Sequence, residues 1–343
     1  MDVAFPARLR KFSFVVILLL LFGGCGSGNG SSPVPHAAKL IFVGYFCFGA
    51  QPSSVRIFAA DANGSAAPLA ILGGDQTGIT APAAVALDRI DQLYVANAAS
   101  SNPAILVFAQ GASGNVAPMR SISGSNTGLN APFGVVVDQA GNIFVANEGA
   151  SNVLKFDAAA NGNVAPVAII AGANTGLAAP PLGPLEISLD IRQRIYVTNV
   201  PNNSVLIFAP DADGNVAPIA TLAGPNTGLD GPIQAVFGPS GRIYVSDNTH
   251  CFPNCTGAEP FAITVYKRHA SGDAVPVRTI TGSNTHLFLP AGIAVDDTEQ
   301  IYAANQKDNS VQIFPRGSDG NVAPRIIAGS NPNVCVARSL AVD

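Results

Sequence analysis

The sequence repeats itself about every fifty residues. A short apolar phrase that closes on an aromatic residue occurs six times, with gaps of 50, 48, 52, 58 and 48 residues, and it ends at Phe58, Phe108, Phe156, Phe208, Tyr266 and Phe314. Self-similarity at a fixed period is typical of repeat architectures, in which each copy is one unit that packs on its neighbours. The fold must therefore accommodate six similar units.

Three further phrases recur with the same period. One ends at Asn97, Asn147, Asn199, Asp247 and Asn305, with a degenerate first copy at Tyr45. Another places Pro68, Pro118, Pro166, Pro218, Pro276 and Pro324 before a short apolar run. The last ends at Asp88, Asp138, Asp190, Asp296 and Asp343, with Gly238 in the remaining slot. β-Branched and aromatic runs bounded by Gly, Pro, Asn and Asp predict strands.

Each repeat therefore predicts four antiparallel strands. We name them a (ending in Asp), b (ending in Asn), c (ending in the aromatic residue) and d (following Pro). The chain contains 35 Gly and 26 Pro, is 48% hydrophobic and is only 12% charged, which argues against both long helices and disorder. Four-stranded sheets that must cover both faces pack radially, so the sequence predicts an all-β, six-bladed β-propeller.

The order of the phrases predicts how the ring closes. The chain begins at a strand b and ends at a strand a, so strand a in 337–343 would join strands b to d in 39–72 as the sixth blade. This arrangement removes two exposed sheet edges. We therefore expect one propeller domain over 39–343.

These phrases resemble those of the NHL-repeat six-bladed propellers. The matching pieces are P-x-G-V-V-V-D at 132–138, G-N-I-F-V-A-N at 141–147 and N-V-L-K-F at 152–156. The d–a segment, such as 124–132, is longer than the usual family spacing. The resemblance implies the fold but no single function, because propellers of this kind include lactonases, lyases and pure binding modules.

Residues 1–25 are typical of an export signal. Arg8, Arg10 and Lys11 precede an almost wholly apolar run over 12–22, and two glycines lead to Cys25. Small residues before a cysteine resemble a bacterial lipoprotein signal, so we expect Cys25 to be lipidated, an ordinary signal peptide being the alternative. The Gly- and Ser-rich segment 26–38 reads as a flexible linker. The expected location is the bacterial cell envelope, at the outer membrane or cell surface.

Four other cysteines test this topology, because an exported protein permits disulfides. Cys47 follows strand b of the closing blade, and Cys335 precedes strand a of the same blade. Cys251 and Cys255 share one b–c insertion. We therefore predict the pairs Cys47–Cys335 and Cys251–Cys255. A metal site for these thiols is the alternative, but the four histidines are scattered.

Catalytic residues are sought where the repeats differ, since a recurring Asp or Asn fits a structural turn. Four positions before the end of strand a, the repeats carry Ala84, Gly134, Glu186, Gln234, Gly292 and Ser339. Glu186 and Gln234 break the rule of small residues, and Arg338 lies one position earlier in the last copy. We expect all three near the mouth of the central channel, either binding a ligand or making polar contacts between blades.

A calcium-dependent, lactonase-like hydrolase is the alternative function, with Glu186 as the candidate catalytic and metal-binding residue. The aligned column offers no second carboxylate and no general base, so we assign no catalytic residue, metal or cofactor. The insertion 249–261, with Phe252 and Phe261, is the preferred contact element on the face of the b–c and d–a loops.

Charge excludes one class of partner. The chain has 18 Lys+Arg against 22 Asp+Glu and no Trp, which gives no footprint for nucleic acid. The favoured function is an envelope-anchored, monomeric binding or scaffold module for a protein or small ligand. A purely architectural surface protein is a third possibility.

Overall fold

The structure is a computed structural model that describes residues 39–47, 52–180, 183–248, 260–328 and 335–343. Within these ranges the strands form six four-stranded antiparallel sheets. Blade 1 contains β4 (Pro82–Leu87), β5 (Leu93–Asn97), β6 (Ala104–Phe108) and β7 (Arg120–Ser123). Blade 2 contains β8 (Pro132–Val137), β9 (Ile143–Asn147), β10 (Asn152–Phe156) and β11 (Ala168–Ile170). Blade 3 contains β12 (Ile187–Leu189), β13 (Ile195–Asn199), β14 (Ser204–Phe208) and β15 (Ala220–Leu222).

The remaining sheets follow the same order of strands. Blade 4 contains β16 (Pro232–Phe237), β17 (Ile243–Asp247), β18 (Ala262–Tyr266) and β19 (Arg278–Thr281). Blade 5 contains β20 (Pro290–Val295), β21 (Ile301–Asn305), β22 (Ser310–Phe314) and β23 (Arg325–Ile327). The closing blade contains β24 (Cys335–Val342), β1 (Leu40–Cys47), β2 (Ser54–Ala59) and β3 (Ala70–Gly73).

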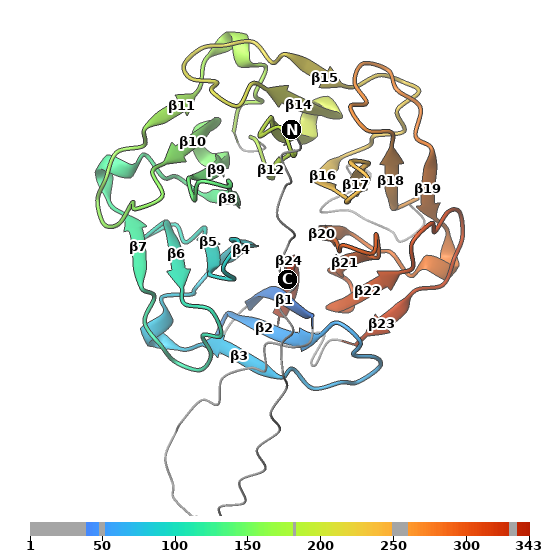
Figure 1. Ribbon diagram of the computed structural model, residues 1–343, viewed down its shortest axis with the longest axis horizontal. Coiled ribbons are helices and arrows are strands. Elements are labelled where there is room, and N and C mark those ends of the chain that lie inside the picture. Colours follow the sequence, from blue (N-terminus) through green and yellow to red (C-terminus); the bar gives the residue numbers. More distant parts are fainter. Residues whose placement is uncertain (1–38, 48–51, 181–182, 249–259, 329–334) are drawn as a thin grey trace, which may run out of the picture. The chain divides into compact units, whose positions relative to one another are not determined.

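The six blades form a ring. Figure 1 shows β4, β8, β12, β16, β20 and β24 nearest the centre, and each of them contacts its neighbours around the ring. Hydrophobic clusters lie between consecutive blades; in one of them Ile105 of blade 1 packs with Val145 of blade 2. All five residues of β9 are buried, because neighbouring blades cover both faces of that strand. The predicted six-bladed β-propeller is confirmed.

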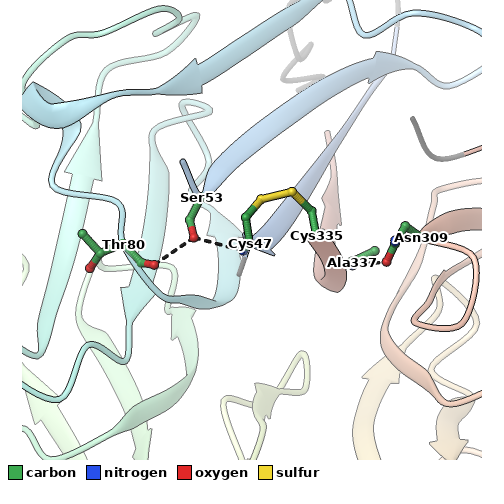
Figure 2. Close-up of a disulfide and its surroundings, with 6 residues drawn as sticks. All are labelled: Cys47, Ser53, Thr80, Asn309, Cys335 and Ala337. Atoms are coloured by element: carbon green, nitrogen blue, oxygen red, sulfur yellow. Dashed lines mark hydrogen bonds between the residues drawn. A yellow bond between two sulfur atoms is a disulfide. The ribbon is translucent and has the colours of Figure 1, made fainter. Parts of the chain in front are cut away.

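The closing blade joins the two ends of the propeller as predicted. β24 pairs with β1 from Ile41↔Val342 to Cys47↔Cys335, with one register shift (Figure 1). A disulfide links Cys47 to Cys335 across 288 residues of sequence, which confirms the first predicted pair (Figure 2).

Hydrogen bonds tie this seam to the blades on both sides. Ser53 Oγ accepts from the Cys47 backbone N–H at 3.1 Å and donates to the Thr80 carbonyl at 2.8 Å (Figure 2). On the other side, Asn309 Oδ1 accepts from the Ala337 backbone N–H at 3.3 Å. The inner edge of the closing blade is therefore held by backbone pairing, a covalent bond and side-chain contacts together.

The proline phrase has a role that the sequence analysis missed. The connection before each strand d forms a parallel β-bridge with strand d of the preceding blade, as between Gly162 and Ile122. The next residue, Asn163, accepts at Oδ1 from the Asn126 backbone N–H at 2.7 Å, beside Gly124. We call this contact the inter-blade clasp. It recurs at Asn115, Asn215, Asp273 and Asn321.

The predicted export signal (1–25), lipidated Cys25 and linker (26–38) lie outside the described residues, as does the Cys251–Cys255 pair. Among the residues that are described, no helix is long and apolar enough to cross a membrane. These predictions keep the status of expectations.

Candidate functional site

The two faces of the ring carry different connections. In blade 2, Pro132 at the start of strand a pairs with Asn147 at the end of strand b, so the b–c and d–a connections emerge together. We call this side the upper face. The lower face carries the a–b and c–d turns, where Asp138 Oδ1 accepts from the backbone N–H groups of Ala140 and Asn142, both at 2.8 Å. The recurring Asp therefore shapes a turn, as the sequence indicates.

Glu186 lies just before β12 and is only 3% exposed. Its carboxyl oxygen Oε2 borders Gly134 of blade 2, whose lack of a side chain leaves room for it. Burial raises the pKa of this carboxyl well above its ordinary value, and the hydrogen bond from the Ile187 backbone N–H opposes that shift. Glu186 is therefore a buried acid packed between two blades.

Gln234 lies on β16 and reaches in the opposite direction around the ring. Its Oε1 accepts from the Ile293 backbone N–H of blade 5 at 2.6 Å. Glu186 faces blade 2 and Gln234 faces blade 5, so the two side chains do not converge on a common ligand. Both make the inter-blade contacts that the sequence analysis kept as an alternative.

These side chains do not fit a calcium ion. Calcium takes six to eight oxygen ligands, whereas Glu186 and Gln234 face different blades and Gln234 Oε1 already accepts from backbone. In the ranges that the structure describes, no group of three or more His, Cys, Asp or Glu side chains could hold a metal. No hydrolytic step through a metal can be built from these residues.

Arg338 is the candidate whose side chain forms the fewest polar contacts. Its guanidinium carbon lies 4.9 Å from the ring centre of Phe46 and 5.7 Å from that of Phe133, so two aromatic rings border it. Burial lowers the pKa of this guanidinium, and the charge of Glu148 opposes that shift. Among the described residues no hydrogen bond or ion pair within 4 Å engages the group. Within the described ranges its five N–H donors have no acceptor.

Of the two expected contact residues in the insertion, Phe252 and Phe261, the structure describes only Phe261. Phe261 is 3% exposed and its ring centre lies 4.9 Å from that of Phe288, so it belongs to the core between blades 4 and 5. Phe261 begins the buried approach to β18 and presents little surface, and its predicted contact with a partner stays a prediction. Phe252 lies outside the described residues.

Asp247 is a chemically distinct group that the sequence analysis left among the structural repeats. It is 1% exposed, and its Oδ2 accepts from Thr264 Oγ at 2.8 Å. Burial raises the pKa of this carboxyl to about 8, while the hydrogen bond from Thr264 opposes the shift. The signal was present in the sequence, since Asp247 is the one carboxylate in a column of asparagines.

Comparisons with known proteins show the fold and no family. No protein-family model matches the chain, and no curated protein matches it in sequence. A solved protein of unknown function from Bacteroides caccae has a TM-score of 0.62 at 11% identity, over 89% of this chain and 99% of that one. The periplasmic gluconolactonase PpgL of Pseudomonas aeruginosa has a TM-score of 0.55 at 13% identity, over 89% and 99%.

A chain of a nidogen/laminin complex is similar to the same degree. Its TM-score is 0.56 at 14% identity, over 89% of this chain and 98% of that one. At such identities the likeness establishes the propeller fold alone. One scaffold thus occurs in a gluconolactonase and in a nidogen/laminin complex, so function must be argued from side chains.

Proposed function

We propose that this protein is an envelope-anchored, NHL-like propeller that binds a carboxylate-bearing ligand or partner segment on its upper face. The observation that carries the proposal is Arg338, a guanidinium bordered by Phe46 and Phe133 whose donors meet no acceptor among the residues that the structure describes. The planar guanidinium of arginine can donate two parallel hydrogen bonds to a carboxylate. These charge-assisted hydrogen bonds become stronger as water is excluded. The anchor at Cys25 and the export signal are part of this proposal and rest on the sequence alone.

The aromatic border explains why binding is favoured over a purely architectural role. A solvated surface arginine gains little from a single anion, since water and salt screen the pair. Arg338 is instead partly desolvated between two rings, so part of its solvation has already been given up before a ligand arrives. Glu148 is near enough to affect its pKa but forms no ion pair within 4 Å. A ligand carboxylate would complete the coordination of this group.

The test is ligand binding by the protein expressed from its full chain, with gluconate and a glutamate-rich peptide as probes. We expect one of the probes to bind and Arg338→Gln to weaken that binding about tenfold, the loss of one charge-assisted contact. Arg316→Gln is the matched control, because Arg316 is 72% exposed on the lower face. Failure of both probes to bind, or equal loss in both variants, would contradict the proposal.

A lactonase-like hydrolase is the competing function, and the likeness to a periplasmic gluconolactonase is the observation in its favour. The same preparation can be assayed for hydrolysis of glucono-1,5-lactone beside its isosteric Glu186→Gln variant. The binding proposal expects the uncatalysed rate in both. Hydrolysis that disappears in Glu186→Gln would establish the enzyme instead.

A further inference from the structure

A second pocket lies on the lower face, between blades 3 and 4. It is a cavity of about 180 Å³ whose wall includes Ile191, Tyr196, Phe237, Arg268 and His269. It is far in the fold from Arg338, because the a–b and c–d turns form it and the upper-face loops do not contribute. Nothing in the proposed function uses this pocket.

Blade 4 departs from the repeat at one position beside this pocket. Gly238 stands where Asp88, Asp138, Asp190, Asp296 and Asp343 close strand a in the other copies. Gly238, Pro239 and Gly241 therefore line the cavity without a carboxylate of their own. The stem of Arg268 covers Gly241, where a Cβ would come within 2.9 Å of the arginine Cδ. A Cβ on Gly238 would face Tyr244 and Val295, which do not line the cavity, so the glycine removes a negative charge beside the pocket without creating its space.

The c–d turn of blade 4 is also the most basic of the six. It reads Lys267-Arg268-His269, where the turn of blade 5 has Pro315-Arg316-Gly317. Arg194 donates from Nη2 to His269 Nδ1 at 2.6 Å and also pairs with Asp190 at 2.7 Å. Since arginine can only donate, Nδ1 is the acceptor and Nε2 carries the imidazole proton.

The charge balance around His269 is positive. Four charged groups act on the imidazole: the three cations Arg192, Arg194 and Arg268 and the carboxylate of Asp190. Together they carry an excess of two positive charges. Burial and then these arginines lower the pKa of His269, in agreement with a neutral ring. Arg268 makes no hydrogen bond or ion pair with any described residue, whereas Arg316 at the equivalent position pairs with Glu299 at 3.5 Å.

The opposite wall is apolar. Ile191 is 74% exposed, and the Phe237 ring packs edge-on against Tyr196 with centroids 4.6 Å apart. A ligand for this pocket must therefore combine an anionic group with an apolar body. Asp190 within the wall disfavours a doubly charged phosphate, because like charges repel at short range.

We propose that this lower-face pocket binds a small organic monocarboxylic acid, with the carboxylate on Arg268 and His269 Nε2 and the apolar body against Ile191 and Phe237.

Calorimetric titration of the protein expressed from its full chain tests the assignment, with benzoate as the probe. We expect Arg268→Gln to weaken benzoate binding about tenfold, the equivalent of one charge-assisted hydrogen bond. Arg316→Gln makes the same change at the same position of blade 5 and should leave benzoate binding unaltered. Arg338→Gln should also leave it unaltered, which separates this pocket from the proposed upper-face site.

Two further probes and one more variant make the test decisive. Benzamide has the shape of benzoate without its charge, and inorganic phosphate has charge without an apolar body; both should bind more weakly than benzoate. Gly238→Asp restores the carboxylate of the other blades beside Tyr244 and should weaken benzoate binding through charge repulsion; blade 1 already accommodates the same pairing of Asp88 with Tyr94. Absent benzoate binding, tighter binding of phosphate or benzamide, or insensitivity to Arg268→Gln would overturn the proposal.

Discussion

Asp247 occupies a position that blades 1, 2, 3 and 5 give to asparagine. In blade 2, Asn147 Oδ1 accepts from the Asn130 N–H at 2.7 Å, and its Nδ2 donates to the Gly128 carbonyl at 3.0 Å. An ionised aspartate can accept but cannot donate. Asp247 keeps the accepting contact, from the Asp230 N–H at 3.2 Å, and replaces the donating one by accepting from Thr264. One blade thus carries a buried group that titrates.

We predict that Asp247 makes the fold less stable as pH rises. Its pKa is about 8 in the folded chain and about 4 in the unfolded chain, so the folded state binds the proton more tightly. Its contribution is fully present below about pH 4 and is lost as pH rises towards 8. Between pH 5 and pH 8 the wild-type protein should lose up to about 3–4 kcal/mol of unfolding free energy through this group. The variant Asp247→Asn should not show this loss.

Urea unfolding at pH 5 and pH 8 measures this difference. Asp138→Asn is the control, because an asparagine there retains the oxygen that accepts from the turn. Asp247→Asn should flatten the wild-type dependence on pH, and Asp138→Asn measures what an Asp-to-Asn change costs in a turn. An unchanged slope in Asp247→Asn would show that another group carries the pH response.

Comparison of repeats identified the unusual residues but not the direction of their side chains. The aligned column correctly separates Glu186 and Gln234 from the small residues around them. Whether these side chains enter the channel or a blade interface depends on packing with Gly134 and Ile293 in other repeats. That packing joins residues up to 59 positions apart, so a single repeat does not encode it.

At the scale of elements, the inter-blade clasp explains why two phrases recur together. The glycine that opens each 3₁₀ turn in the d–a connection, such as Gly124 at φ 113°, leaves space that the Asn163 side chain of the next blade fills. A Cβ on Gly124 would lie 2.7 Å from the Asn163 Cγ. The sequence predicted the strands well because each is local, whereas the clasp became visible only once consecutive blades were placed together.

We predict that Asn163→Ala destabilises the propeller by about 0.5–1 kcal/mol, because the Asn126 N–H loses its acceptor at an exposed position where water can replace it. Asn163→Asp should be nearly neutral, since blade 4 makes the same contact with Asp273 at 2.7 Å. Urea unfolding of the two variants compares them directly. Equal losses in Ala and Asp would mean that the amide NH₂ group, and not the oxygen, is the stabilising part of the clasp.

At the scale of the whole molecule, two sets of contacts close the ring, one near its centre and one near its rim. The inner closure is the ladder of β24 with β1 and the Cys47–Cys335 disulfide. The outer closure is the parallel β-bridge between Gly64 and Ile327. In it the Gly64 N–H donates to the Ile326 carbonyl at 2.8 Å, and the Ala328 N–H donates to the Gly64 carbonyl at 2.7 Å. The sequence predicted the inner closure from the order of its phrases. The outer closure followed the pattern of the other five bridges.

Because the ladder and the outer bridge remain without the disulfide, its loss should weaken the ring without opening it. Cross-linking residues 288 positions apart lowers the entropy of the unfolded chain, which is equivalent to roughly 6 kcal/mol of stability at most. We predict that the paired change Cys47→Ser and Cys335→Ser lowers the unfolding free energy by up to that amount and leaves the circular dichroism spectrum of the folded protein unaltered.

Reduction provides the control for this last prediction. Dithiothreitol should destabilise the wild-type protein nearly as much as the paired substitution does, and it should have little further effect on the variant. Any further loss in the variant reports the second predicted disulfide, Cys251–Cys255, whose short loop restricts the unfolded chain far less. If the paired substitution instead abolishes the folded spectrum, backbone pairing of the two ends is too weak to close the ring, and the disulfide is a condition for the fold.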